Sequence, residues 1–160
     1  MFSSAEIIDF AVQIEQNGER LCREVAQRNI DPELASLLEW MADQEAQHIK
    51  WFSDLKLKSN IAGNFSQLAQ FGEGLLREVL GDQSFSLRDA DFSKIQNIKE
   101  LLSLLIEFER DTVLFYEMLQ TAVEDKKANS LLDKIIAEEN QHVVQIKDYF
   151  NKRFGRIEPQ

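Results

Sequence analysis

The 160-residue sequence contains only one cysteine, two prolines and six glycines. The single thiol, Cys22, excludes an internal disulfide framework and any metal site built from several cysteines. Because proline and glycine are the residues that most often interrupt helices, their scarcity favours long helices. The hydrophobic fraction of 44% excludes a disordered acidic chain, and this length predicts one domain over residues 1–160.

The chain also has fewer basic than acidic residues, 18 against 28, and no long apolar run. Its net charge of −10 argues against a nucleic-acid-binding surface, which needs clustered lysine and arginine. The apolar segment LLSLLI (101–106) is far shorter than the about 18 residues of a membrane span, so we expect no membrane partner. The first residues, MFSSAEIIDF, lack the basic region and the apolar run of a secretory signal. Together with the single thiol of the chain, this predicts a cytoplasmic location.

Apolar residues recur at intervals of three and four along most of the chain, which predicts an all-α fold. The four expected long helices cover about 3–28, 31–57, 93–123 and 127–154. Their boundaries rest on capping patterns, which are Ser3 with Glu6, Asp31 before Pro32, Ser93 with Gln96, and Gly155 after the last helix.

The segment 58–92 has a different pattern, with one shorter amphipathic stretch ending at Gly81 and then the polar sequence GDQSFSLRDAD. A structureless connection of this length is uncommon in a compact domain. It fits a crossover containing a short helix, because two antiparallel helix hairpins joined with their inner helices parallel need a long connection. The sequence therefore predicts a four-helix bundle made of two antiparallel hairpins.

An internal repeat relates the second and fourth predicted helices. A shift of 94 residues places DPELASLLEWMADQEAQH (31–48) on DKKANSLLDKIIAEENQH (125–142). The two histidines of the chain each follow a glutamate by three positions, as Glu45 with His48 and as Glu139 with His142. Residues at this spacing project from one helix face, so each pair can aim an oxygen and a nitrogen at one point.

The same shift places a third glutamate, Glu15, on Glu109, and all six residues fall on the apolar faces of their predicted helices. The neighbouring acids Glu107 and Glu138 do not lie on these apolar faces. Glu107 lies roughly 200° from Glu109 around its helix, and Glu138 lies about 100° from the adjacent glutamate, so we expect both to face solvent.

Four carboxylates in one bundle core need compensation, because burying a charge costs several kcal/mol per ion. The apolar faces carry no lysine or arginine near these glutamates. Two divalent cations would balance the four charges, and this arrangement of glutamates and Glu-x-x-His pairs is the one found in di-iron and di-manganese carboxylate bundles. Iron or manganese suits the oxygen-rich set better than zinc. The alternative is a metal-free, water-containing core.

The chain resembles the ferritin-like superfamily, and most closely its rubrerythrin-like branch. The resemblance covers AVQIEQNGERLC (11–22), LLEWMADQEAQHIKWF (37–52), IEFERDTVLFY (106–116) and IIAEENQHVVQI (135–146). It implies two iron ions, with Glu15 and Glu109 as terminal ligands. It further implies that Glu45 and Glu139 bridge the ions and that His48 and His142 bind one ion each.

The resemblance also implies chemistry with O₂ or H₂O₂, as a ferroxidase or a peroxide-reducing oxidoreductase in oxidative-stress defence or iron handling, and a homodimer. Rubrerythrins with a four-cysteine rubredoxin domain carry their own electron donor. This chain has one cysteine, so the donor is expected to be external. Thr112 replaces an additional glutamate of those enzymes. Tyr116 either hydrogen-bonds a ligand carboxylate or is a core tyrosine.

Two other functions stay open at this point. One is an iron-binding or cargo protein without steady turnover, and the other is a metal-free helical interaction module.

Gly18 and Thr112 lie one turn beyond Glu15 and Glu109, where small side chains either leave room for an oxygen species or permit close helix packing. Cys22 is expected to be a small buried residue.

Overall fold

The computed structural model describes residues 4–28, 31–57 and 97–155, which form long α-helices. In chain order they are α1 (Ser4–Ala26), α2 (Pro32–Leu57), α4 (Ile98–Ala122) and α5 (Lys126–Phe154). The predicted all-α four-helix architecture is confirmed. The predicted crossover at 58–92, with its short helix, lies outside the described residues.

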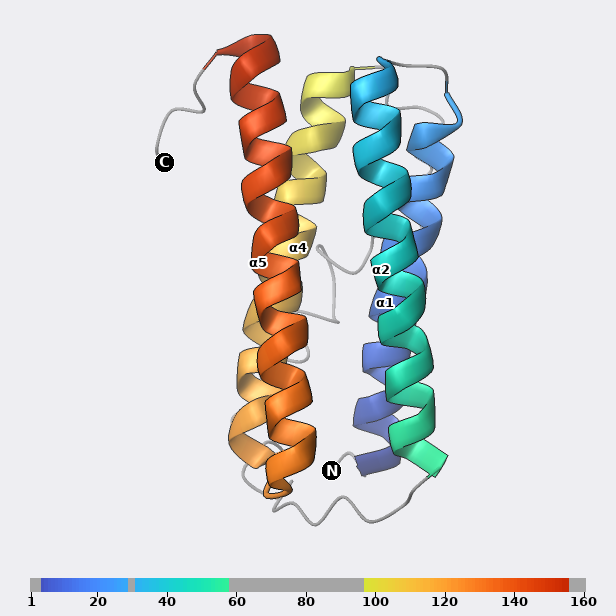
Figure 1. Cartoon of the computed structure of the whole chain (residues 1–160), viewed down its shortest axis with the longest axis vertical. Coiled ribbons are helices and arrows are strands. Elements are labelled where there is room, and N and C mark those ends of the chain that lie inside the picture. Colours follow the sequence, from blue (N-terminus) through green and yellow to red (C-terminus); the bar gives the residue numbers. More distant parts are fainter. Residues whose placement is uncertain (1–3, 29–30, 58–96, 156–160) are drawn as a thin grey trace.

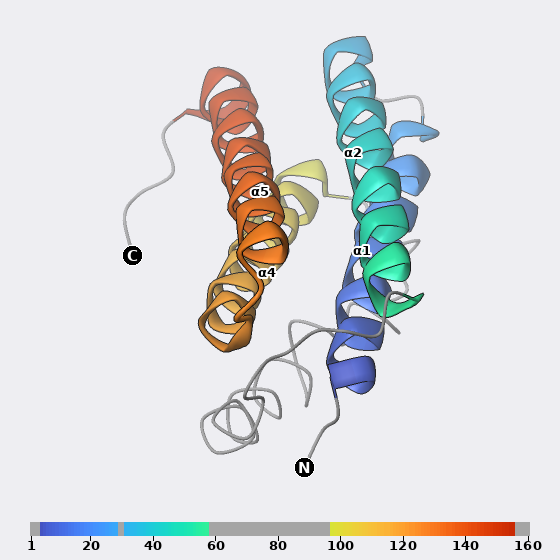
Figure 2. The same ribbon diagram turned by 60° about the horizontal axis from the view of Figure 1, so that its bottom comes forward.

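The helices form two antiparallel hairpins, as predicted. The first hairpin is α1 packed along α2, and the second is α4 packed along α5. Figure 1 shows α2 and α4 running in the same direction, so the end of α2 and the start of α4 lie at opposite ends of the bundle. Figure 2 shows the two hairpins facing each other, which places the core between them.

Side-chain caps define the starts of α2 and α5. The carboxylate of Asp31 accepts a hydrogen bond from the backbone N–H of Glu33 at 3.3 Å, and α2 begins at the next residue after the cap, as predicted. Asp125 caps α5 in the same way, one residue before the helix begins. Gly155 ends α5 with a φ of 88°, a left-handed conformation that favours glycine.

The start of α4 differs from the prediction. The helix begins at Ile98 instead of residue 93, because Asn97 has extended backbone angles and its side chain accepts hydrogen bonds from the N–H groups of Lys99 and Glu100. Asparagine is as good an N-cap as serine, so Ser93 and Asn97 were equally acceptable caps. The local sequence does not show which of the two begins the helix. Residues 3, 93 and 96 of the predicted capping boxes lie outside the described residues.

The core is apolar along most of its length and polar at its middle. Leucine, isoleucine, phenylalanine and methionine side chains of all four helices fill the space between the hairpins. Among the described residues, the buried polar and charged side chains are Glu15, Asn17, Glu45, His48, Glu109, Thr112, Glu139 and His142. None of the helices in the described part of the chain is long and apolar enough to cross a membrane.

Candidate metal centre

The structure brings all six predicted site residues together at the middle of the bundle. Each hairpin contributes one glutamate from its first helix and a Glu-x-x-His pair from its second. The contributors are Glu15 of α1, Glu45 and His48 of α2, Glu109 of α4, and Glu139 and His142 of α5. Every one is at most 3% exposed, so the site is closed off from bulk water.

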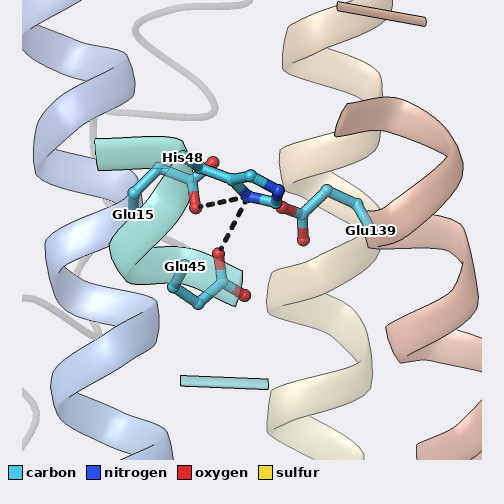
Figure 3. A group of neighbouring side chains, drawn as sticks. All are labelled: Glu15, Glu45, His48 and Glu139. Atoms are coloured by element: carbon cyan, nitrogen blue, oxygen red, sulfur yellow. Dashed lines mark hydrogen bonds and ion pairs between the residues drawn. The ribbon is translucent and has the colours of Figure 1, made fainter. Parts of the chain in front are cut away.

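The six side chains form two overlapping groups of possible metal ligands. The first comprises Glu15, Glu45, His48 and Glu139, and the second exchanges Glu15 and His48 for Glu109 and His142. Within each group the ligand atoms lie within 4.8 Å of one another. Figure 3 shows the first group, in which side chains of α1, α2 and α5 converge.

Both imidazoles direct Nδ1 at these carboxylates. Nδ1 of His48 lies 2.9 Å from Glu139 Oε1 and 3.3 Å from Glu15 Oε2. Nδ1 of His142 lies 3.2 Å from oxygens of both Glu45 and Glu139. One nitrogen and several oxygens therefore face each of two neighbouring points, and Glu45 and Glu139 face both.

The buried polar atoms that lack hydrogen-bond partners are concentrated in this site. Among the described residues, seven buried side-chain atoms have none, and six of them belong to Glu45, Glu109, Glu139 and His142. Unsatisfied buried acceptors are costly, and native proteins keep them where an ion or water completes the site. An oxygen-rich, negatively charged donor set with unpartnered lone pairs fits divalent iron or manganese.

Charge repulsion and burial shift the titration of these groups. Burial, and after it the charge of Glu139, raises the pKa of Glu45 and of Glu109 well above the usual value. Burial alone would lower the pKa of each histidine, but the adjacent carboxylates outweigh it and raise both, that of His142 to about 12. Protons thus relieve the negative charge when no metal is bound, and metal binding must displace them.

Tyr116 is fully buried beside the site and donates a hydrogen bond to Oε1 of Glu15. Burial, and then the charge of Glu15, raises the pKa of the Tyr116 hydroxyl, so it stays protonated as a donor. The bond fixes one oxygen of Glu15 and leaves Oε2 directed at His48. Of the two interpretations of Tyr116, the structure shows the hydrogen bond to a site carboxylate.

We expect Tyr116→Phe to lower the free energy of unfolding of the metal-free protein by about 2 kcal/mol, since a hydrogen bond to a charged group contributes about 1.5–3 kcal/mol. Tyr149→Phe is the matched control, because its hydroxyl also donates to a carboxylate, Asp31, at 2.8 Å, but Asp31 is only partly buried and does not belong to the metal centre. Urea denaturation of both variants measures the difference. A loss in Tyr149→Phe as large as that in Tyr116→Phe would contradict the assignment.

The outer nitrogens of the histidines contact two residues that the sequence did not identify. Nε2 of His48 lies 2.7 Å from Oε2 of Glu138, and Nε2 of His142 lies 2.6 Å from Oε1 of Gln44. The prediction that Glu138 faces solvent is therefore wrong, since its side chain is only 24% exposed and reaches across to α2. Glu107 is exposed, as predicted.

A sequence signal for these contacts exists in the repeat. Gln44 and Glu138 directly precede the repeated glutamates, and the shift of 94 residues places one on the other. Helix periodicity gives the direction in which Glu138 points from its own helix. It does not show that the imidazole of His48, on the opposite hairpin, lies in that direction.

The small residues near the site support close packing. A Cβ atom on Gly18 would lie 3.3 Å from Cε1 of Phe108 and 3.6 Å from Cδ of Glu45. The hydroxyl of Thr112 donates to the carbonyl of Phe108 at 2.9 Å, within its own helix. Cys22 is fully buried, and this burial raises its thiol pKa, so it is a small buried residue, as predicted.

Comparisons with known proteins bear on the fold and on the family of the chain. A crystal structure of a Thermotoga maritima protein, described as a ferritin-like diiron-carboxylate protein, superposes with a TM-score of 0.67 over 96% of each chain. The two sequences are 22% identical, which shows the shared fold. Comparison with curated proteins finds no match. A sequence model of the rubrerythrin family matches residues 6–150, a range that includes all six converging residues. The chain therefore belongs to the rubrerythrin family.

Proposed function

We propose that the protein binds two iron ions in the overlapping ligand groups and acts as an oxidoreductase toward O₂ or H₂O₂, as a ferroxidase or peroxide-reducing enzyme. The observation that carries the proposal is the convergence of two four-residue groups that share Glu45 and Glu139 and leave buried oxygens without partners. Family membership supports the choice of oxidant. Bound iron would supply the electrons for reduction of the oxidant.

The chain's own residues perform the positioning. Glu45 and Glu139 belong to both groups, so they would bridge the two ions, whereas Glu15 and Glu109 belong to one group each and would be terminal ligands. The histidines direct Nδ1 inward and use Nε2 for an outer contact, which fixes the tautomer that offers a lone pair to a metal. Tyr116 would hold the orientation of Glu15.

The proposal includes an external electron donor, because a chain with one cysteine holds no four-cysteine iron site. Manganese is the alternative metal for the same donor set. The homodimer expected from the family resemblance stays a prediction.

Iron binding without steady turnover is the second candidate, and Thr112 favours it. This residue stands one turn beyond Glu109, and its hydroxyl is bonded to its own helix, so it offers no further carboxylate at the site. Such a protein would oxidise its iron once and then retain it.

Stopped-flow oxidation of the protein loaded anaerobically with two equivalents of Fe(II) tests the proposal. We expect oxidation faster than that of free Fe(II) with O₂ or H₂O₂, and repeated oxidation when an external reductant is present. A single stoichiometric oxidation with excess reductant would favour the iron-binding alternative. Failure to bind two equivalents of iron would contradict both.

A further inference from the structure

The two histidines of the site have chemically different outer partners. Nε2 of His48 meets the carboxylate of Glu138 at 2.7 Å, whereas Nε2 of His142 meets the amide oxygen of Gln44 at 2.6 Å. Both contacts cross between the hairpins, since α5 supplies the partner of His48 and α2 supplies the partner of His142. The geometry of the two contacts is thus alike, and their charge differs.

This difference occupies equivalent positions of the internal repeat. The shift of 94 residues that places Glu45 on Glu139 and His48 on His142 also places Gln44 on Glu138. The inner ligands are of the same residue type in both halves. The outer partners of the two histidines, in contrast, differ in charge.

The outer partner of a metal-binding histidine changes the strength of its inner nitrogen as a ligand. An imidazole that donates its N–H to a carboxylate becomes more basic at the other nitrogen than one that donates to a neutral amide. Hydrogen bonds with an ionised partner are also about twice as strong as neutral ones, so the carboxylate holds the ring orientation more firmly.

The surroundings of the two outer contacts preserve the difference. Lys134 lies 3.8 Å from the other oxygen of Glu138 and is mostly exposed, so water screens its charge. Beside His142, the ring of Trp40 makes a T-shaped contact with the imidazole at a centroid distance of 5.4 Å and adds no charge.

We infer that Glu138 and Gln44 make the two metal sites unequal, with the His48 group binding a divalent cation more tightly than it would with an amide partner. The inference rests on the proposed dimetal site and adds to it a residue that determines relative site affinity. Glu138 is a positioning residue, because it acts through His48. One cation would then bind first, beside His48, and the second would bind beside His142.

Two reciprocal substitutions test the inference. Glu138→Gln makes both outer partners amides, and Gln44→Glu makes both carboxylates, each with little change in side-chain volume. The metal-free protein is titrated with Co(II) under anaerobic conditions. Calorimetry and the absorbance of the bound ion measure each binding step. Glu107→Gln, an exposed change on α4, is the control for loss of one carboxylate.

For the wild type we expect two resolved binding steps. Glu138→Gln should weaken the tighter step by about 10- to 100-fold, the usual effect of losing an outer partner of a metal-binding histidine. Gln44→Glu should strengthen the weaker step, a gain that a merely structural role would not produce. Melting curves of the metal-free variants verify that each one folds.

The outcomes separate the inference from the proposed function. If the wild type binds two equivalents and both variants titrate as it does, or if both weaken binding, the inference is overturned and the dimetal site remains. If the folded wild type binds fewer than two equivalents of Co(II), the dimetal proposal fails, and the inference fails with it.

Discussion

Replacing Glu139 with glutamine is expected to weaken both metal-binding steps by more than about 100-fold, a larger effect than the loss of an outer contact. Glu139 belongs to both ligand groups, and its two oxygens have no hydrogen-bond partner. Glutamine keeps the shape of the side chain, but its NH₂ group has no lone pair to offer a second ion. Titration with Co(II) or with anaerobic Fe(II) measures each step.

The terminal glutamates give the matched comparison. Glu15 and Glu109 each belong to a single group, so Glu15→Gln and Glu109→Gln should each weaken one binding step far more than the other. Glu107→Gln is the neutral control, since that residue is exposed on α4. Glu138 cannot serve as the control, because it contacts His48. A Glu139→Gln variant that loses only one step would contradict the bridging assignment.

Removal of metal is expected to lower the melting temperature of the protein by about 10–20 °C. At a free metal concentration 100 times the dissociation constant, each site stabilises the folded state by about 2.7 kcal/mol, and two sites by about 5 kcal/mol. A domain of this size changes its melting temperature by about 2–4 °C per kcal/mol. Calorimetry with and without a chelator measures the change, and a metal-free protein as stable as the loaded one would contradict the account.

The difference in stability between the metal-bound and the metal-free protein should grow as pH rises from 5 to 8. The folded-state pKa values of Glu45, Glu109, His48 and His142 are raised, so their stabilising contributions are complete below the unfolded values and decline as pH increases. The unfolded values are about 4.3 for glutamate and 6.5 for histidine. The metal-free protein should therefore become less stable across this range, whereas metal binding strengthens because its ligands lose their protons more readily. A metal-free protein that gains stability over the same range would contradict the assigned shifts.

The sequence was sufficient for the site because its residues repeat. Spacing of three residues within a helix and one shift of 94 residues select the four glutamates and two histidines without knowledge of the third dimension. Buried carboxylates are rare unless they are paired or bind a metal, so four of them on apolar faces predict a common cationic partner such as metal ions.

Two predictions were wrong, the start of α4 and the exposure of Glu138. Asn97 and Ser93 are equally good caps by residue type, and only the backbone shows that α4 begins after Asn97. Glu138 lies to one side of the apolar face of its helix, and its contact depends on which imidazole of the opposite hairpin reaches it. Helix periodicity cannot give that information, because it describes one helix at a time.

Anomalous diffraction at the iron absorption edge, from crystals of the protein loaded with Fe(II), would show directly whether two ions bind between the converging side chains. We expect two iron peaks within the bundle, one beside Nδ1 of His48 and the other beside Nδ1 of His142, with the carboxylates of Glu45 and Glu139 shared between them. A bundle with the same fold and no iron between these side chains, or with iron bound only at the surface, would contradict this expectation.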